Sequence, residues 1–329
     1  MTKTIFHLSY DHIISVENLL GAWREFVRGK RHKPDVQAFA FRLMDNILAL
    51  HRDLQAKTYR HGPYQHFRIH DPKSRDIHKA TVRDRLVHHA IHRVLYWFYH
   101  QMFIADSFSC RLGKGTHKAI NRFRAFAYHA SQNHTKTLWV LKCDILKFFA
   151  SIDHEILLTI LRKRIPDEKI IWLLTEIVSS FYSTRPGVGL PLGNLTSQLL
   201  VNLYLNEFDQ FVKHRLKVKH YLRYADDFVL LSPDRGQLIE SLSYMGVFLH
   251  EQLRLVLHPD KVSLKTLASG VDYLGWVHFP DHRVLRTATR WRMLKNIKQQ
   301  EGRERERSVA SYLGLIGHGN TYKLRSLIQ

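Results

Sequence analysis

Two adjacent aspartates stand inside an apolar segment of this sequence, and their position calls for a chemical explanation. The segment reads RYADDFVLLS and places Asp226 and Asp227 between short apolar runs. Adjacent carboxylates repel each other, and burial of even one is costly unless a partner neutralises it. A bound cation is one such partner. An exposed turn is the alternative, because Asp tolerates bends well.

A third aspartate, Asp144, ends the apolar run TLWVLKCD far upstream. If folding brings it to the paired aspartates, the carboxylates form an all-oxygen site suited to Mg²⁺, which binds through few carboxylates, waters and substrate phosphates. Two such ions about 4 Å apart would activate an attacking 3′-hydroxyl and stabilise a leaving pyrophosphate. Taken alone, the pair of aspartates is a weak signal, and turn chemistry is the preferred interpretation of it.

The composition is strongly basic. The chain has 329 residues, 50 Lys and Arg against 29 Asp and Glu, and a formal net charge of +21. Such an excess indicates a polyanionic partner, of which nucleic acid is the usual one; a generally solvated basic surface is the alternative. The 45% hydrophobic content is enough for a core and more than one subdomain.

Cysteine usage and the N-terminal segment predict a cytoplasmic protein. Cys110 and Cys143 are too few for a disulfide framework, which fits a reducing compartment. The N-terminal segment, MTKTIFHLSYDHIIS, has no long apolar core or small-residue cleavage site, and no run of about 18 apolar residues occurs. We therefore expect no membrane partner.

The first hundred residues are expected to form helices around one hairpin. Ser15 is the expected N-cap of one helix, and a second continues from Asp35 through Leu54. The segment around Asp71-Pro72-Lys73 predicts a hairpin with a basic tip. Residues 81–104 predict a helix, whose apolar face is expected to contain Leu86, Ala90, Val94 and Trp97.

Downstream, strands and helices alternate irregularly. We expect a strand over roughly 137–145, a helix capped by Asp153, and a long helix from near Asn194. The segment HYLRYADDFVLLS predicts two short strands with a bend at Ala225 and Asp226, and VDYLGWVHF predicts a last strand pair. Residues 283–308 predict one basic helix. The absence of a regular βαβ alternation favours an α+β fold.

The segment Tyr224-Ala225-Asp226-Asp227 matches the YxDD box of reverse transcriptases, and other blocks resemble that family in the same order. They are PKSRDIHKATVRDRLVHHAI, RLGKGTHKAI, CDILKFFASID, GLPLGNLTSQLLVNLYLNEFD, LRLVLHPDKV and YLGW, spread over roughly residues 60–280. The resemblance implies a right-hand polymerase with fingers, a palm with an antiparallel sheet, and thumb helices. It also implies three segments: an N-terminal helical extension (1–60), fingers and palm (61–280) and a basic helical thumb (281–329).

The same resemblance implies roles for individual residues. Asp144, Asp226 and Asp227 are implied to be the catalytic metal ligands, helped by the Ile145 carbonyl. They are implied to bind two Mg²⁺ ions, for which Mn²⁺ can substitute. Lys261 stands where the family is proposed to protonate pyrophosphate.

Other residues are implied to bind the dNTP. Lys73 and Arg75 fall where fingers cations hold the triphosphate, with a solvated hairpin tip as the alternative. Phe149 falls where an aromatic ring excludes a ribose 2′-hydroxyl, with a core position as the alternative; for Phe148 we prefer the core.

The block LPLGNLTSQ departs from most bacterial relatives, which have Pro-Gln-Gly and end in Ser-Pro. Here Leu192 precedes Gly193, and Gln198 follows Ser197, a combination that resembles the reverse transcriptases of diversity-generating retroelements. These enzymes copy a template-repeat RNA with frequent errors at adenines. Leu192 cannot make the hydrogen bond that Gln makes near the dNTP sugar, although a harmless core substitution is the alternative.

The C-terminal third is implied to hold the nucleic acid. The primer grip maps to Tyr273, Leu274, Gly275 and Trp276. Arg286, Arg290 and Lys295 are expected to contact template–primer phosphates from a thumb helix with an apolar seam of Trp291, Leu294 and Ile297. An ordinary solvated helix face is the alternative, and we prefer it for EGRERERS.

The partners implied are template RNA, the RNA/cDNA duplex, dNTPs and a small basic accessory protein that forms a pentamer. His88, His89 and His92 have no acidic or Cys partner at metal-ligand spacing, so we expect them to face RNA or solvent. Two other functions stay open: a retron-like or intron-derived reverse transcriptase of ordinary fidelity, and a phage-defence or RNA-binding polymerase-like protein.

Overall fold

The computed structural model describes residues 4–70 and 74–328, so Lys73 lies outside the described residues. The chain divides into two compact units that interleave along the sequence. The first unit comprises Met1–Ala105, Ile145–Phe211 and Val247–Val256, and the second comprises Asp106–Asp144, Val212–Gly246 and Leu257–Gln329. The division into 1–60, 61–280 and 281–329 stays a prediction.

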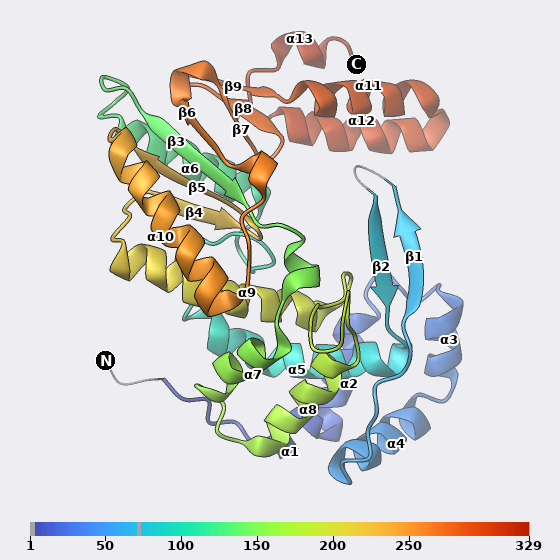
Figure 1. The fold of residues 1–329 in the computed structure, drawn as a ribbon. Helices are drawn as coiled ribbons and strands as arrows, with labels where there is room; N and C mark the ends of the chain where they lie inside the picture. Colours follow the sequence, from blue (N-terminus) through green and yellow to red (C-terminus); the bar gives the residue numbers. More distant parts are fainter. Residues whose placement is uncertain (1–3, 71–73, 329) are drawn as a thin grey trace. The chain divides into compact units, whose positions relative to one another are not determined.

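The first unit is mainly helical (Figure 1). Its helices are α1 (Tyr10–Ile14), α2 (Val16–Phe26), α3 (Pro34–Phe41), α4 (Leu43–Gln55), α5 (Val82–His100), α7 (His154–Arg162), α8 (Glu168–Ser179), α9 (Leu195–Gln210) and the 3-10 helix η1 (Phe148–Ser151). Helix α10 (Arg235–Leu253) starts in the range of the second unit and ends in that of the first. Ser15 and Asp153 cap α2 and α7 through their side chains, as predicted.

Helix α5 packs against α2 and α9 and forms the centre of this unit. The predicted apolar face is buried at Leu86, Ala90 and Val94, but the prediction is wrong for Trp97, which is 58% exposed. Trp97 lies eleven residues after Leu86 and therefore on the same side of the helix, but packing at this end covers Leu95 and Tyr99 instead. The single helix expected from Asp35 to Leu54 is interrupted at Arg42, whose backbone has φ −121° and ψ 45°.

Strands β1 (Gln65–Ile69) and β2 (Arg75–Lys79) form the predicted hairpin in the first unit. They pair antiparallel, with Ile69 opposite Arg75. The hairpin stands out from the neighbouring helices as a two-stranded ribbon, drawn in light blue and cyan in Figure 1.

The second unit is built on a four-stranded antiparallel sheet. Its strand order is β4 (Tyr221–Tyr224), β5 (Asp227–Ser232), β3 (Trp139–Asp144) and β6 (Ser263–Thr266). The central strands β3 and β5 are apolar and largely buried, and each is hydrogen-bonded to a neighbouring strand on both edges. Helix α6 (Thr116–Ala130) packs on the face that carries Leu138, Val140, Val229 and Leu231.

A three-stranded sheet and three helices complete the second unit. They are β7 (Val271–Tyr273), β8 (Trp276–His278), β9 (Arg283–Leu285), α11 (Thr287–Gln299), α12 (Gly302–Ile316) and α13 (Tyr322–Arg325). Short helical turns occupy Phe211–Arg215 (η2), Pro259–Lys261 (η3) and Leu267–Ser269 (η4). The single basic helix expected over 283–308 is wrong: β9 forms first, and extended backbone at Gln300 separates α11 from α12. The two helices lie side by side in Figure 1.

Candidate active site

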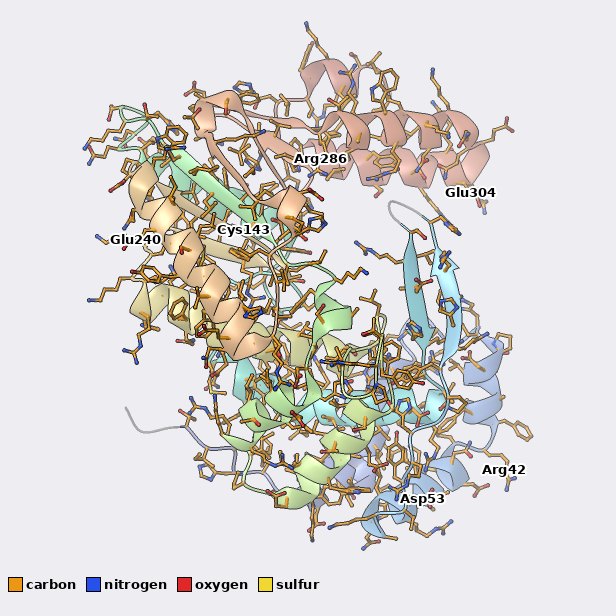
Figure 2. All side chains as sticks on the ribbon, viewed as in Figure 1. Arg42, Asp53, Cys143, Glu240, Arg286 and Glu304 are labelled. Atoms are coloured by element: carbon orange, nitrogen blue, oxygen red, sulfur yellow. The ribbon has the colours of Figure 1, made fainter. Side chains whose placement is uncertain are left out.

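Three aspartates gather at one end of the four-stranded sheet. Asp144, the last residue of β3, stands opposite Asp227, the first residue of β5. Directly opposed residues of antiparallel strands have Cβ atoms about 5 Å apart. Asp226 lies in the two-residue turn between β4 and β5, because Tyr224 pairs with Asp227. Cys143, labelled in Figure 2, marks this end of β3.

The turn that contains Asp226 has a strained backbone and is stabilised by a buried arginine. Ala225 has φ 55°, a left-handed conformation that costs a non-glycine residue about 1–2 kcal/mol. Arg223 is only 1% exposed, and its Nη1 donates to the Ala225 carbonyl at 3.0 Å. The Tyr224 hydroxyl accepts from Thr116 Oγ1 at 3.2 Å. Arg223 is a supporting residue that the sequence analysis missed.

Asp227 is a buried carboxyl with a perturbed pKa. Burial raises its pKa to about 7, the neighbouring Asp144 and Asp226 add to the rise, and Lys142 opposes it. Its Oδ2 lies 3.6 Å from Lys142 Nζ, whereas its Oδ1 is buried and has no hydrogen-bond partner among the described residues. A buried carboxylate oxygen of this kind needs a cation or a proton.

Asp144 is paired with the lysine that the resemblance singled out. Lys261 Nζ donates to Asp144 Oδ1 at 2.9 Å, and the Asp144 carbonyl accepts from the His258 amide at 2.8 Å. Lys142, Asp144 and Lys261 line a cavity of about 200 Å³. Two lysines of the protein, Lys142 and Lys261, therefore bring positive charge to the carboxylates.

The donor set fits divalent cations. Three carboxylates, one of them with an unpartnered buried oxygen, offer hard oxygen ligands that suit Mg²⁺ or Mn²⁺. Within the described residues, no group of three or more His, Cys, Asp or Glu side chains is arranged as a ready metal cage. Mg²⁺ keeps waters and binds substrate phosphates, so two or three carboxylates at a strand end are a sufficient protein contribution. Ile145, whose side chain is buried, directly follows Asp144.

Lys142 is a second residue that the sequence analysis missed. Its Nζ donates to the Asp272 carbonyl at 2.8 Å and lies near Asp227, so it links β3 to β7. The Asp272 side chain forms an ion pair with Arg286. The available signal was strand alternation, because Lys142 precedes Asp144 by two residues and shares its face.

The predicted dNTP residues that the structure describes, apart from Lys261, lie in the first unit. The His78 amide of β2 donates to the Leu192 carbonyl at 3.1 Å, and Asn194 Nδ2 donates to the His78 carbonyl at 3.2 Å. Arg75 begins the same strand. The β1–β2 hairpin and the Leu192 segment are thus joined by one backbone and one side-chain hydrogen bond.

Gly193 makes this close approach feasible. It has φ +105°, and a Cβ there would lie 3.0 Å from Ile77 Cγ2. Phe149 is half-buried, and its carbonyl accepts from the Leu190 amide at 2.8 Å, whereas Phe148 is buried in the core. Gln198 lies in the first turns of α9, partly exposed.

The predicted primer grip is the β7–β8 hairpin. Tyr273 and Trp276 face one another across the strands and are both buried, so their rings support the hairpin from inside. Leu274 and Gly275 form the turn with φ 50° and 87°. The Arg286 amide donates to the Gly275 carbonyl at 3.0 Å. Of the four predicted residues, Leu274 and Gly275 are the partly exposed ones.

The basic residues predicted on the thumb differ in their surroundings. Arg290 and Lys295 are exposed on α11. Arg286, labelled in Figure 2, lies where β9 leads into the helix and is paired with Asp272. The predicted apolar seam is wrong for Trp291, which is 68% exposed; Met293 and Ile297 are the buried residues of α11.

The histidines of α5 do not all face solvent. The prediction is wrong for His88, which is fully buried and hydrogen-bonds Thr196 through Nδ1 and His61 through Nε2. Burial lowers the pKa of His88 to about 3, so its ring is uncharged at neutral pH. His89 and His92 are partly buried, and burial lowers the pKa of each to about 4.

An antiparallel sheet that ends in opposed carboxylates, within a mixed α+β chain, defines the right-hand polymerase class. Telomerase from Candida albicans has the same fold, with a TM-score of 0.51 at 10% identity over 73% of this chain and 50% of that chain. The sequence profile of the reverse transcriptase (RNA-dependent DNA polymerase) family matches residues 69–278, more than half of the chain. The chain belongs to the reverse transcriptase family.

Curated relatives include intron-encoded proteins. Escherichia coli protein YkfC is 26% identical over 86% of this chain and 84% of YkfC. The group II intron-encoded protein LtrA of Lactococcus lactis is 23% identical over 74% of this chain and 51% of LtrA. A putative COX1/OXI3 intron 2 protein of Saccharomyces cerevisiae is 20% identical over 69% of this chain and 33% of that protein. The chain thus spans about half or less of these two intron-encoded relatives.

The comparisons confirm the predicted fold class and the predicted enzyme class, an RNA-directed DNA polymerase. Template RNA and dNTPs are the expected ligands of that family. Within the described residues, no helix combines the length and apolar character needed to cross a bilayer.

Proposed function

We propose that this reverse transcriptase is error-prone and copies a template-repeat RNA into adenine-mutagenised cDNA for a diversity-generating retroelement. The observation that carries the proposal is that the block following Pro191 contains both Leu192 and Gln198. The Leu192 carbonyl is bound to the fingers strand through the His78 amide, which places this departure beside Arg75's strand.

Nucleotidyl transfer is assigned to the aspartates of the second unit. Asp144, Asp226 and Asp227, with the Ile145 carbonyl, would hold two Mg²⁺ ions or Mn²⁺ in their place. Bound there, the ions supply activation of the 3′-hydroxyl and stabilisation of the pyrophosphate. Lys261 carries the proton destined for the pyrophosphate at its Nζ, 2.9 Å from Asp144 Oδ1.

Choice of the nucleotide is assigned to the first unit. Arg75, with Lys73, would grip the triphosphate, and the ring of Phe149 would exclude a 2′-hydroxyl. Gly193 and Gln198 would border the incoming nucleotide. A Gln at position 192 would add a hydrogen bond near the sugar, whereas Leu192 cannot; loss of one such bond removes about 1 kcal/mol of geometric control.

The catalytic assignment predicts complete loss of synthesis on removal of a ligand. Asp226→Ala and Asp227→Ala are each expected to abolish Mg²⁺-dependent dNTP incorporation on an RNA template, because the remaining carboxylates cannot hold both ions. Primer extension measures this, and Glu240→Ala, which removes an exposed carboxylate of α10, is the control. Incorporation at the wild-type rate by either variant contradicts the assignment.

The fidelity assignment predicts that Leu192→Gln lowers misincorporation opposite template adenine several-fold. The reason is the restored hydrogen bond near the dNTP sugar, worth about 1 kcal/mol. Sequencing of cDNA made on a defined RNA template measures the error spectrum. Leu192→Met, which keeps an apolar side chain, is the matched control, and identical spectra for all three proteins exclude Leu192 from the mechanism.

A retron-like or intron-derived reverse transcriptase of ordinary fidelity is the second candidate, favoured by the intron-encoded relatives. A phage-defence or RNA-binding polymerase-like protein is the third. A low, uniform error rate in the cDNA selects the second candidate. Further partners proposed with the first are the RNA/cDNA duplex and a small basic pentameric accessory protein; addition of that protein is a second arm of the sequencing experiment.

A further inference from the structure

The second unit contains a polar cavity of about 430 Å³ that the polymerase assignment does not use. Its wall is formed by α6, the β8–β9 connection and the segment after α12. The ionisable residues of the wall are Arg124, His278, Asp281, His282, Arg283 and His318. Within the described residues, Asp281 is the single acidic member of this set, so the lining carries a net positive charge.

Arg283 brings a poorly compensated charge to the cavity. Its Nε donates to the His318 carbonyl, and its Nη2 donates to Asn121 Oδ1 at 2.9 Å. Both acceptors are neutral. Its Nη1 is buried and has no hydrogen-bond partner in the described part of the chain. Burial and the nearby Arg124 guanidinium both lower the pKa of Arg283, as expected where cations meet without a counter-ion.

His278 forms an uncharged part of the wall. The residue is 3% exposed and lines the cavity. Its ring centroid lies 4.5 Å from that of Phe123, and the ring hydrogen-bonds the Tyr273 backbone, so the ring is fixed in place. Burial lowers the pKa of His278 to about 4, so the imidazole brings no positive charge to the lining at neutral pH.

The segment after α12 is built to close this wall. A Cβ at Gly319 would lie 2.1 Å from Trp276 Cζ3, so only glycine allows the segment to approach the β8 strand. The Asn320 amide donates to the Arg283 carbonyl at 2.9 Å. The cavity is therefore a constructed feature of the fold, held by backbone contacts on both sides.

We propose that this cavity binds a phosphate group through Arg124 and Arg283. Planar guanidinium groups bind phosphate oxygens through paired N–H donors. The two side chains come from separate elements, α6 and β9, which suits an anion with several oxygens. The volume suits a small phosphorylated ligand or one phosphate of a strand. The site shares no residue with the carboxylate site and does not depend on polymerase activity.

The test is a titration of the full chain with three probes in EDTA: inorganic phosphate, adenosine 5′-monophosphate and a short single-stranded oligonucleotide. Calorimetry is expected to show saturable binding of at least one probe. Arg124→Gln is expected to weaken it about tenfold or more, because one charge-assisted contact is lost. Arg124 is exposed and has no described hydrogen bond, so its replacement leaves the fold intact.

The controls separate this site from others. Arg162→Gln removes an exposed arginine of α7 in the first unit and is expected to leave the affinity unchanged. Asp226→Ala is also expected to bind normally, so loss of synthesis and loss of this site are distinguishable. A preference for the mononucleotide identifies a small ligand, and a preference for the oligonucleotide identifies a strand phosphate. No saturable binding of any probe, or equal weakening by Arg124→Gln and Arg162→Gln, overturns the proposal.

Discussion

At the scale of single residues, two lysines partly offset the negative charge of the three aspartates. Lys142 and Lys261 reach different aspartates, Asp227 and Asp144 respectively. The pairing of β3 with β5 places the carboxylate of Asp144 opposite that of Asp227, and the two repel each other. Each lysine offsets part of this repulsion. Compensation is incomplete, because one oxygen of Asp227 stays without a partner among the described residues.

This imbalance predicts a pH dependence of stability in metal-free protein. The pKa of Asp227 is about 7 in the folded state and 3.8 when unperturbed. Between these values the folded state binds the proton more tightly than the unfolded state, so the free energy of unfolding falls as pH rises through about 7. Asp227→Asn is expected to remove this loss, on the order of 1–3 kcal/mol between pH 5 and pH 8.

Urea denaturation in EDTA at the two pH values measures the effect as a difference between wild type and variant. That difference cancels the other titrating groups. Asp281→Asn, at an exposed carboxylate, is the control and is expected to follow the wild type. Parallel pH profiles for wild type and Asp227→Asn contradict the prediction.

At the scale of elements, a buried hydrogen-bonded chain joins α5 to the first turn of α9. His61 Nδ1 donates to the Gly62 carbonyl at 2.7 Å, which leaves His61 Nε2 as an acceptor. His88 Nε2 then donates to it at 3.1 Å, and His88 Nδ1 accepts from the Thr196 hydroxyl. Every ring nitrogen of the two histidines is satisfied in this one arrangement.

Removal of the hydroxyl is expected to destabilise the first unit. Thr196→Val keeps the shape but leaves His88 Nδ1 buried and unpaired, at a cost of about 1–3 kcal/mol in the free energy of unfolding. Thr196→Ser keeps the hydroxyl and is expected to lose less. Urea denaturation compares the two variants; a serine variant as unstable as the valine variant would show that packing, not the hydrogen bond, matters at this position.

The sequence predicted elements well where a local signal exists. Caps at Ser15 and Asp153 and the turn at Ala225 and Asp226 follow from side-chain chemistry within a few residues. The break at Arg42 has no such signal, whereas Gly302, with φ 52°, was an available signal for the break at Gln300. Periodicity shows that a residue could face the core, but tertiary packing decides whether a neighbour covers it, so Trp97 and Trp291 were placed wrongly.

The candidate site divides in the same way. Asp144, Asp226 and Asp227 are recognisable because their motif is local, and the register of β3 and β5 then brings them together. The contributions of Lys142 and Arg223 depend on partners far away in the sequence or on burial, which no local pattern reveals.

At the scale of the whole molecule, the net charge of +21 is the feature that a nucleic acid meets first. Charge alone attracts any polyanion, whereas a specific grip needs cations at fixed positions. Arg290 and Lys295 are exposed on α11, which Met293 and Ile297 anchor to the unit. Arg303 and Arg305 are exposed on α12, within a segment of alternating charge.

The two pairs of cations allow a matched comparison. The double variant Arg290→Ala, Lys295→Ala is expected to weaken binding of an RNA/DNA duplex and to reduce the slope of log K against log salt by about 2, because two phosphate contacts are lost. Arg303→Ala, Arg305→Ala removes the same charge and is expected to leave the slope nearly unchanged. Fluorescence anisotropy over a salt series measures both. Equal reductions in the two double variants would mean that net charge, rather than the position of α11, determines the affinity.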